Sequence, residues 1–119
     1  LHASDNMLSG EIPQQLQSSG NQIRPLKYIN LQSNSLTGTI PTNLRLSQVT
    51  YFDLGRNSLS GPIPNDLGVD FRELRHLFLD HNSLTGTIPT SIPTAGNGRL
   101  EILQVNHNLL SGRVPDNFD

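Results

Sequence analysis

The sequence predicts a solenoid, a rod of short coils stacked on one another, because a single motif recurs along the chain. The segment Leu26–Pro41, LKYINLQSNSLTGTIP, returns with small changes in the segments that begin at Val49, Leu74 and Leu100. A fifth copy, incomplete at its start, begins at Leu1. Every copy carries an asparagine at the same place, and successive ones stand 23 to 28 residues apart: Asn6, Asn34, Asn57, Asn82 and Asn108.

Length and composition fit one solenoid domain. At 119 residues the chain has the size of a single domain. We divide it into five repeats, 1–25, 26–48, 49–73, 74–99 and 100–119, of which the first and last are incomplete. Only 34% of the residues are apolar. That is lean for a globular core but sufficient where each coil adds a thin layer to the next.

Each repeat opens with a segment in which apolar residues alternate with other residues, the pattern of a half-buried strand. The segments are Tyr28–Gln32, Tyr51–Gly55, His76–Asp80 and Ile102–Asn106. Because each is followed by a return path on the same side, consecutive strands are expected to pair in parallel. They would line the inner face of a curved rod.

The repeated asparagine follows two residues after each predicted strand. Its side chain has both a donor and an acceptor, so turned inward it can satisfy backbone groups where the chain leaves the sheet. The leucine two residues further on is expected inside as well. Next comes the pattern [S/T]-G-x-[I/V]-P, in which Gly permits an unusual backbone angle and Pro prevents a regular helix.

The return paths differ most between repeats. They leave room for a turn or two of helix at most, and Ile23, Leu46 and Phe71 are expected to point inward before the next strand. Two longer stretches, Ser18–Asn21 and Thr94–Gly98, read as insertions. We expect both to bulge from the outer side as loops.

The full pattern, L-x-x-L-x-L-x-x-N-x-L-x-G-x-I-P, resembles the plant-type leucine-rich repeat over nearly the whole chain. The resemblance implies an α/β fold: a right-handed leucine-rich-repeat solenoid, or horseshoe, with a parallel sheet on the concave face and short 3-10 or irregular convex segments. It also implies hydrogen bonds between coils along the asparagine column and a second small sheet at the [S/T]-G-x-[I/V]-P segment. The cysteine-bearing end caps common in that family are missing, since the chain has no Cys.

Side chains that point outward from the strands are the candidates for binding. Read across the repeats they form columns whose neighbours stand about 4.8 Å apart. Rings from three repeats meet in one amphipathic patch, and aromatic and Arg side chains are typical anchors of protein interfaces. The alternative is that the rings only cover the sheet. The candidate ligand-binding residues are Tyr28, Asn30, Gln32, Tyr51, Asp53, Arg56, His76, Phe78, Asp80, His81, Gln104 and His107.

Neither a metal site nor a catalytic site is predicted. His81 and His107 are column neighbours, but a third and a fourth ligand are not assured, and a pH-sensitive contact is the better use of two histidines. Asp53 and Asp80 stand one column apart, and we expect both to be open to water. Acid–base chemistry needs shifted pKa values, usually obtained by burial. We therefore predict no enzyme activity and no cofactor.

The sequence favours a non-catalytic module that binds a protein or peptide on its concave sheet. One alternative is a structural subunit docked in a larger assembly. A weaker one is an ice-binding surface on the column of hydroxyl residues Ser9, Thr37, Ser60, Thr85 and Ser111. A net charge of −2 with scattered Lys and Arg argues against binding to nucleic acid. No apolar stretch is long enough to span a membrane, so we expect no membrane contact from this segment.

The resemblance adds a setting and partners. It implies a receptor ectodomain or an inhibitor-like recognition protein, extracellular or at the cell surface. Because the chain begins and ends inside a repeat, we expect it to be an internal piece of a longer chain, with flanking repeats or caps among its partners.

Overall fold

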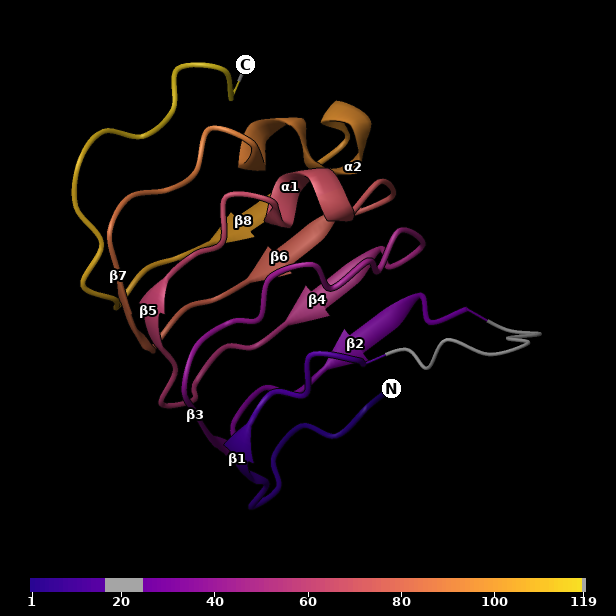
Figure 1. Ribbon diagram of the computed structural model, residues 1–119, viewed down its shortest axis with the longest axis vertical. Helices are drawn as coiled ribbons and strands as arrows, with labels where there is room; N and C mark the ends of the chain where they lie inside the picture. The colour runs from indigo at the N-terminus through magenta and orange to yellow at the C-terminus, as the bar shows by residue number, and fades with distance from the viewer. Residues whose placement is uncertain (17–24, 119) are drawn as a thin grey trace.

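The structure is a computed structural model that describes residues 1–16 and 25–118. Its centre is a four-stranded parallel sheet in the order β2 (Tyr28–Asn30), β4 (Tyr51–Asp53), β6 (His76–Phe78) and β8 (Ile102–Gln104). An isolated bridge between His2 and Asn30 extends it towards the N-terminus. The coils rise along the long axis of the molecule, with the chain termini near its two ends (Figure 1). The parallel solenoid is therefore as predicted.

The register of this sheet matches the predicted columns. Tyr28 lies opposite Tyr51, Tyr51 opposite His76, and His76 opposite Ile102. The strands are three residues long rather than the five expected, but inter-coil bonds continue beyond them. Leu31 N donates to the carbonyl of Asp53 at 2.9 Å, and Leu54 N donates to that of Phe78 at 2.9 Å.

Each coil leaves the sheet through one residue in the left-handed region. The φ angle lies between 51° and 55° at the corresponding residue of every repeat: Asp5, Ser33, Arg56, His81 and His107. None of the five is Gly, and an L-residue in this region costs about 1–2 kcal/mol. The bend comes directly after the segment that the alternating pattern assigns to the strand.

The core is a stack of apolar layers, one from each coil. Ile29, Phe52 and Leu77 face inward from the central strands and are fully buried. Phe71, from the return path, packs on Phe52 with ring centroids 5.0 Å apart. Leu46 is also fully buried, so both described residues predicted to fill the return-path position do so, whereas Ile23 lies outside the described residues.

The asparagine column bonds successive coils together, as predicted. Asn57 Nδ2 donates to the carbonyls of Leu31, Leu54 and Gly55 at 3.0 to 3.2 Å. Its Oδ1 accepts from Leu36 N at 3.0 Å. Equivalent bonds are made by Asn34, Asn82 and Asn108. These four asparagines are half-buried, whereas Asn6 in the first coil is exposed.

The convex side carries only short helical turns: α1 (Leu67–Asp70), the 3-10 turn η1 (Ile92–Thr94) and α2 (Ala95–Gly98). The prediction that Thr94–Gly98 bulges outward is wrong. Ala95 is fully buried, and Gly96 N donates to the carbonyl of Phe71 at 2.8 Å. Small side chains let this segment press against the neighbouring coil. The other predicted insertion, Ser18–Asn21, lies outside the described residues.

Two small parallel sheets lie beside the main one: β1 (Ser9–Glu11) with β3 (Ser35–Thr37), and β5 (Ser60–Pro62) with β7 (Ser83–Thr85). Their register is offset by two residues from the repeat alignment, because Thr37 lies opposite Glu11 and Thr85 opposite Pro62. The hydroxyl residues of the predicted column are therefore not directly opposite one another. Ser60 and Ser111 each donate to a backbone carbonyl at 3.4 Å.

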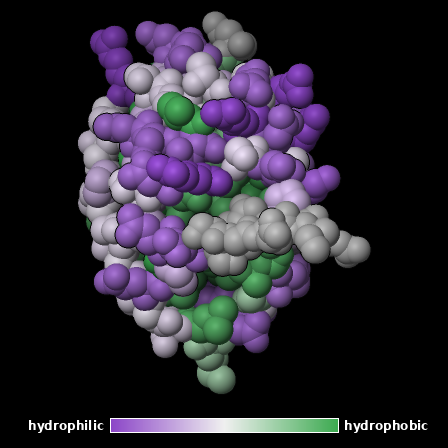
Figure 2. All heavy atoms as spheres, turned by 45° about the vertical axis from the view of Figure 1, so that its right-hand side comes forward, coloured by the Kyte–Doolittle hydropathy of each residue, from purple (hydrophilic) through white to green (hydrophobic). Residues whose placement is uncertain are grey.

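The first and last described coils have a neighbour on one side only, and large apolar side chains are exposed there. Leu1, Met7 and Leu8 are exposed in the first coil, and Leu109 and Val114 in the last. Figure 2 shows a face on which hydrophilic atoms predominate, with hydrophobic atoms between them towards its middle and lower end. In the described part of the chain, none of the helices has the length and apolar character needed to cross a bilayer.

Candidate functional site

The concave sheet carries a continuous row of rings, here called the aromatic ladder: His2, Tyr28, Tyr51, His76 and Phe78. Tyr28 and Tyr51 stack nearly face to face, with centroids 4.4 Å apart and planes 13° apart. Phe78 leans against Tyr51 at 5.3 Å, and His76 meets Tyr51 edge-on at 5.8 Å. The parallel register produces this row, because it places equivalent residues of successive coils side by side.

The ladder is only partly covered. Tyr28 is 40% exposed, and Tyr51, His76 and Phe78 are half-buried. Because the rings of Tyr28 and Tyr51 stack face to face, the ladder presents mainly ring edges to solvent. The packing of one ring on the next supports the alternative that the rings cover the sheet. Their exposed edges are still accessible to a partner.

Three of the candidate residues are buried, which corrects the expectation that Asp53 and Asp80 are open to water. Asn30 is 6% exposed, Asp53 3% and Asp80 6%. The reason is local. The side chains of Asn30 and Asp53, at the ends of their strands, accept hydrogen bonds from nearby backbone N–H groups, and Asp80 contacts the ring of His81.

Asn30 and Asp53 are bonded in the same way in successive coils. Asn30 Oδ1 accepts from Gln32 N at 3.0 Å, and Asp53 Oδ1 accepts from Gly55 N at 2.9 Å. Asn30 Nδ2 contacts the hydroxyl of Tyr28 at 3.5 Å, whereas the hydroxyl of Tyr51 donates to Asp53 Oδ2 at 3.1 Å. Asp53 is thus the charged counterpart of a neutral amide one coil below.

Burial raises the pKa of the Asp53 carboxyl, and the nearby charge of Asp80 raises it further, against the opposing effect of its hydrogen bonds from Gly55 and Tyr51. The pKa of the Tyr51 hydroxyl is raised as well, first by burial and then by the charge of Asp53. The fold therefore holds an ionisable group where a neutral one would be more stable.

Replacing Asp53 by Asn should stabilise the protein at neutral pH. The folded-state pKa of Asp53 lies above its unfolded value. Stability is therefore lost as the pH rises from the unfolded pKa, about 3.9, through the raised folded one. An amide cannot ionise, and the geometry at Asn30 shows that it fits. Thermal unfolding should give D53N a higher Tm than the wild type at neutral pH, with the difference shrinking in acid.

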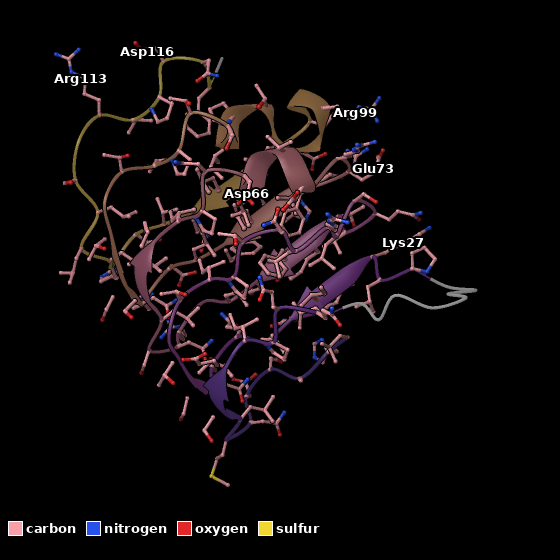
Figure 3. The ribbon with its side chains drawn as sticks, viewed as in Figure 1. Lys27, Asp66, Glu73, Arg99, Arg113 and Asp116 are labelled. Atoms are coloured by element: carbon pink, nitrogen blue, oxygen red, sulfur yellow. The ribbon has the colours of Figure 1, made fainter. Side chains whose placement is uncertain are left out.

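The exposed carboxyl Asp116 supplies the control for that measurement. D116N removes the same charge at the C-terminal edge of the molecule (Figure 3), so its Tm difference from the wild type should be small and flat with pH. A D53N variant less stable than the wild type at neutral pH would contradict the interpretation.

The other polar candidates flank the ladder on the same face. Gln32 is half-buried, whereas Arg56 and Gln104 are exposed. His81 and His107 stack with centroids 4.1 Å apart and planes 9° apart, which confirms that they are neighbours. His81 Nδ1 lies 2.8 Å from Asp80 Oδ2. Within the described residues, no group of three or more His, Cys, Asp or Glu side chains is placed to hold a metal ion.

Two residues beside the ladder, Glu101 and Gly55, were not among the candidates predicted from the sequence. Glu101 lies just before β8 and pairs with Arg75 and with His76, at 3.3 Å from His76 Nε2. The hydrogen bond from Arg75 lowers the pKa of the exposed Glu101 carboxyl. Gly55 is the other, and it is buried beneath Asp53 and Asp80. The sequence Asp–x–Gly at the end of a predicted strand could have pointed to Gly55. Glu101 lies one position before its predicted strand and carried no such signal.

Stacked parallel coils joined by an asparagine column define a leucine-rich-repeat solenoid. The chain belongs to the leucine-rich repeat family: the family model described as Leucine rich repeat matches residues 24–84, more than half of its length. This confirms the resemblance to plant-type repeats. No match was found among curated protein sequences.

Solved structures of plant proteins are similar to this chain. The BIR2 ectodomain from Arabidopsis thaliana is 39% identical, with 97% of this chain and 57% of that one covered and a TM-score of 0.83. A chain of the BIR3–SERK2 complex from Arabidopsis thaliana is 33% identical, with 98% and 60% covered and a TM-score of 0.85. The plant peptide hormone receptor RGFR1 in complex with RGF2 is 31% identical, with 97% and 18% covered and a TM-score of 0.83.

The chain spans less than two thirds of the length of each of these structures. The shared part is the solenoid, and the identity of 31 to 39% extends over nearly all of this chain.

Proposed function

We propose that this solenoid is a non-catalytic module that binds a protein or peptide on its concave sheet. The observation that carries the proposal is the aromatic ladder, a row of partly exposed rings on an uncovered sheet face. Aromatic side chains give interfaces a large contact area at little cost in side-chain entropy. The ladder is held rigid by its own stacking, which lowers the cost of ordering it in a complex.

Similar proteins support the class of ligand. RGFR1 is a plant peptide hormone receptor seen with RGF2, and another similar structure, 34% identical, is PEPR1 with AtPEP1. The BIR3–SERK2 complex pairs two proteins. By likeness to such ectodomains, we place this module outside the cell or at its surface, as part of a recognition protein without enzyme activity.

Tyr51 and Phe78 are proposed as the main anchors, with Tyr28 and His76 beside them. Arg56, Gln32, Gln104 and the stacked pair His81–His107 would supply polar contacts around the rings. Asn30, Asp53 and Asp80 are largely buried beside the rings. This ranking follows interface anatomy, in which packed aromatic residues dominate the affinity and polar side chains at the rim add specificity.

The test uses peptides selected from a random twelve-residue display library on the wild-type protein. The double variant Y51A/F78A should bind them at least about 30-fold more weakly, since interface anchors typically lose about 2 kcal/mol or more on truncation. Val69, exposed on α1, provides the control: V69A should bind as the wild type does. Circular dichroism would show that both variants remain folded.

Unchanged binding by the double variant would exclude the ladder as the site. If binding were lost instead on altering the exposed residues Asn97 and Gly98, the site would lie on the convex side. Either result would overturn the concave-face proposal, whereas the fold would stand.

A further inference from the structure

We infer that the concave face recognises a cationic side chain, arginine or lysine, of an extended peptide, at a pair of carboxylates formed by Asp53 and Asp80. The inference rests on the proposed function and specifies its ligand. It concerns a spot beside the aromatic ladder, between β4 and β6.

The two carboxylates come from neighbouring coils and converge over Gly55. The point that a Cβ atom on Gly55 would occupy lies 2.8 Å from Asp80 Oδ1 and 3.1 Å from Asp53 Oδ1. The lack of a side chain at this position is what lets both oxygens approach. Gly55 stands between Gln32 and Asp80 in its column, so neither neighbouring coil provides the same space.

One oxygen of the pair is left without a partner. Asp53 accepts from Gly55 N and from the Tyr51 hydroxyl, one bond to each oxygen. Asp80 Oδ2 contacts His81 Nδ1, but its Oδ1 has no hydrogen-bond partner among the described residues. Asp80 is only 6% exposed. Because every fully enclosed side-chain oxygen and nitrogen in the described part of the chain is bonded, Oδ1 must reach the surface. It is therefore an acceptor with some access to solvent.

The chain does not neutralise the pair itself. In the described part of the molecule, Arg75 pairs with Glu101 and Arg99 with Glu73, while Arg56 makes no ion pair. His81 is the single basic group in contact with Asp80, and its charge depends on pH. Two carboxylates close together in a largely buried setting therefore lack a permanent counter-charge. Burial raises the pKa of Asp53, and the charge of Asp80 adds to that effect.

A cationic side chain of a peptide fits the carboxylate pair better than a metal ion or a sugar does. A metal ion would need a third ligand group, and none is placed for it among the described residues. A sugar would stack on ring faces, but Tyr28 and Tyr51 stack on each other, Tyr28 also stacks on His2, and Tyr51 also contacts Phe78. Arg or Lys can make charge-assisted hydrogen bonds to Asp80 Oδ1, with the side-chain stem lying along the edges of Tyr51 and Phe78. A guanidinium could also bridge both residues.

The experiment titrates the folded protein with N-acetyl-arginine amide and follows the backbone amide of Gly55 by NMR. That amide donates to Asp53 and so reports on the pair. A saturable shift is expected. N-acetyl-citrulline amide has the same shape without the charge, and it should bind at least tenfold more weakly. Equal binding of the two compounds would overturn the inference.

Two variants locate the binding. D80N keeps the shape of the side chain and should weaken arginine amide binding at least fivefold, whereas D116N, far from the sheet, should not. G55A should also weaken it, because the added methyl group pushes the carboxylates apart. The φ angle of Gly55 is not positive, so alanine is compatible with the backbone there. Unchanged affinity in both D80N and G55A would place the cation elsewhere and refute the assignment.

The result separates this inference from the proposed function. If library-selected peptides depend on Tyr51 and Phe78 while arginine amide leaves Gly55 unshifted up to 100 mM, only the cation subsite fails. If the peptides are indifferent to the ladder while arginine amide binds at Asp80, the subsite stands and the concave peptide-binding proposal fails.

Discussion

Substitution of Gly96 by alanine is expected to destabilise the protein by about 2–5 kcal/mol. Gly96 has a φ of 62°, in the left-handed region, where alanine costs about 1–2 kcal/mol. A methyl group there would also overlap the carbonyl of Leu74, a backbone group that cannot swing aside. Such overpacking costs about 1–3 kcal/mol more. Urea unfolding of G96A should show a much lower midpoint than that of the wild type.

Gly98 provides a matched control two residues away. It also has a left-handed φ, 76°, but a methyl group there would meet nothing within 4 Å. G98A should therefore show the backbone cost alone, and the difference between the two variants measures the close approach of the convex turn to the neighbouring coil. Equal midpoints for G96A and G98A would mean that the turn is not packed as described.

The second large effect is expected at the asparagine column. Asn57→Ala removes four hydrogen bonds that join two successive coils. It leaves Leu36 N without its acceptor, whereas the three carbonyls each keep one other donor, from Asn34, Asn82 or Ser33. An unsatisfied buried group costs about 1–3 kcal/mol. Asn65, an exposed residue of the return path, is the control, because a surface change stays within about ±0.5 kcal/mol.

Chemical denaturation of both variants would decide the matter. Should N57A and N65A unfold at the same urea concentration, water must replace the lost bonds, and the column would be a mark of the repeat rather than a source of its stability.

The sequence was sufficient to predict the sheet because the repeated asparagine sets the phase of every coil. Once Asn34 and Asn57 are aligned, the pairing of Tyr28 with Tyr51 follows, and the structure has that register. The same alignment is misleading in the second sheets, where Thr85 pairs with Pro62. The offset is already present at Ser35, which pairs with Ser9 shortly after the left-handed residue Ser33. The geometry of that bend is not visible as a periodic pattern.

The candidate site was predictable in its rings but not in its charges. Alternation places Tyr51 and Phe78 on the outer face, and they are there. It places Asp53 on that face too, yet it cannot show that a short acidic side chain bends back to accept from Gly55 N. The convex turn was missed for a related reason: the composition of Thr94–Gly98 resembles a loop, and its burial depends on small residues meeting a neighbouring backbone.

The left-handed residue at the exit of each coil has a consequence for how such a surface can change. Asp5, Ser33, Arg56, His81 and His107 share one backbone geometry although their side chains are acidic, neutral or basic. The conformational cost is therefore met by the coil and not by the identity of the residue. A single codon change at any of these positions could alter the charge beside the concave sheet while the layers beneath stay as they are. The rod thus offers a row of exchangeable positions through which new partners can be acquired one substitution at a time.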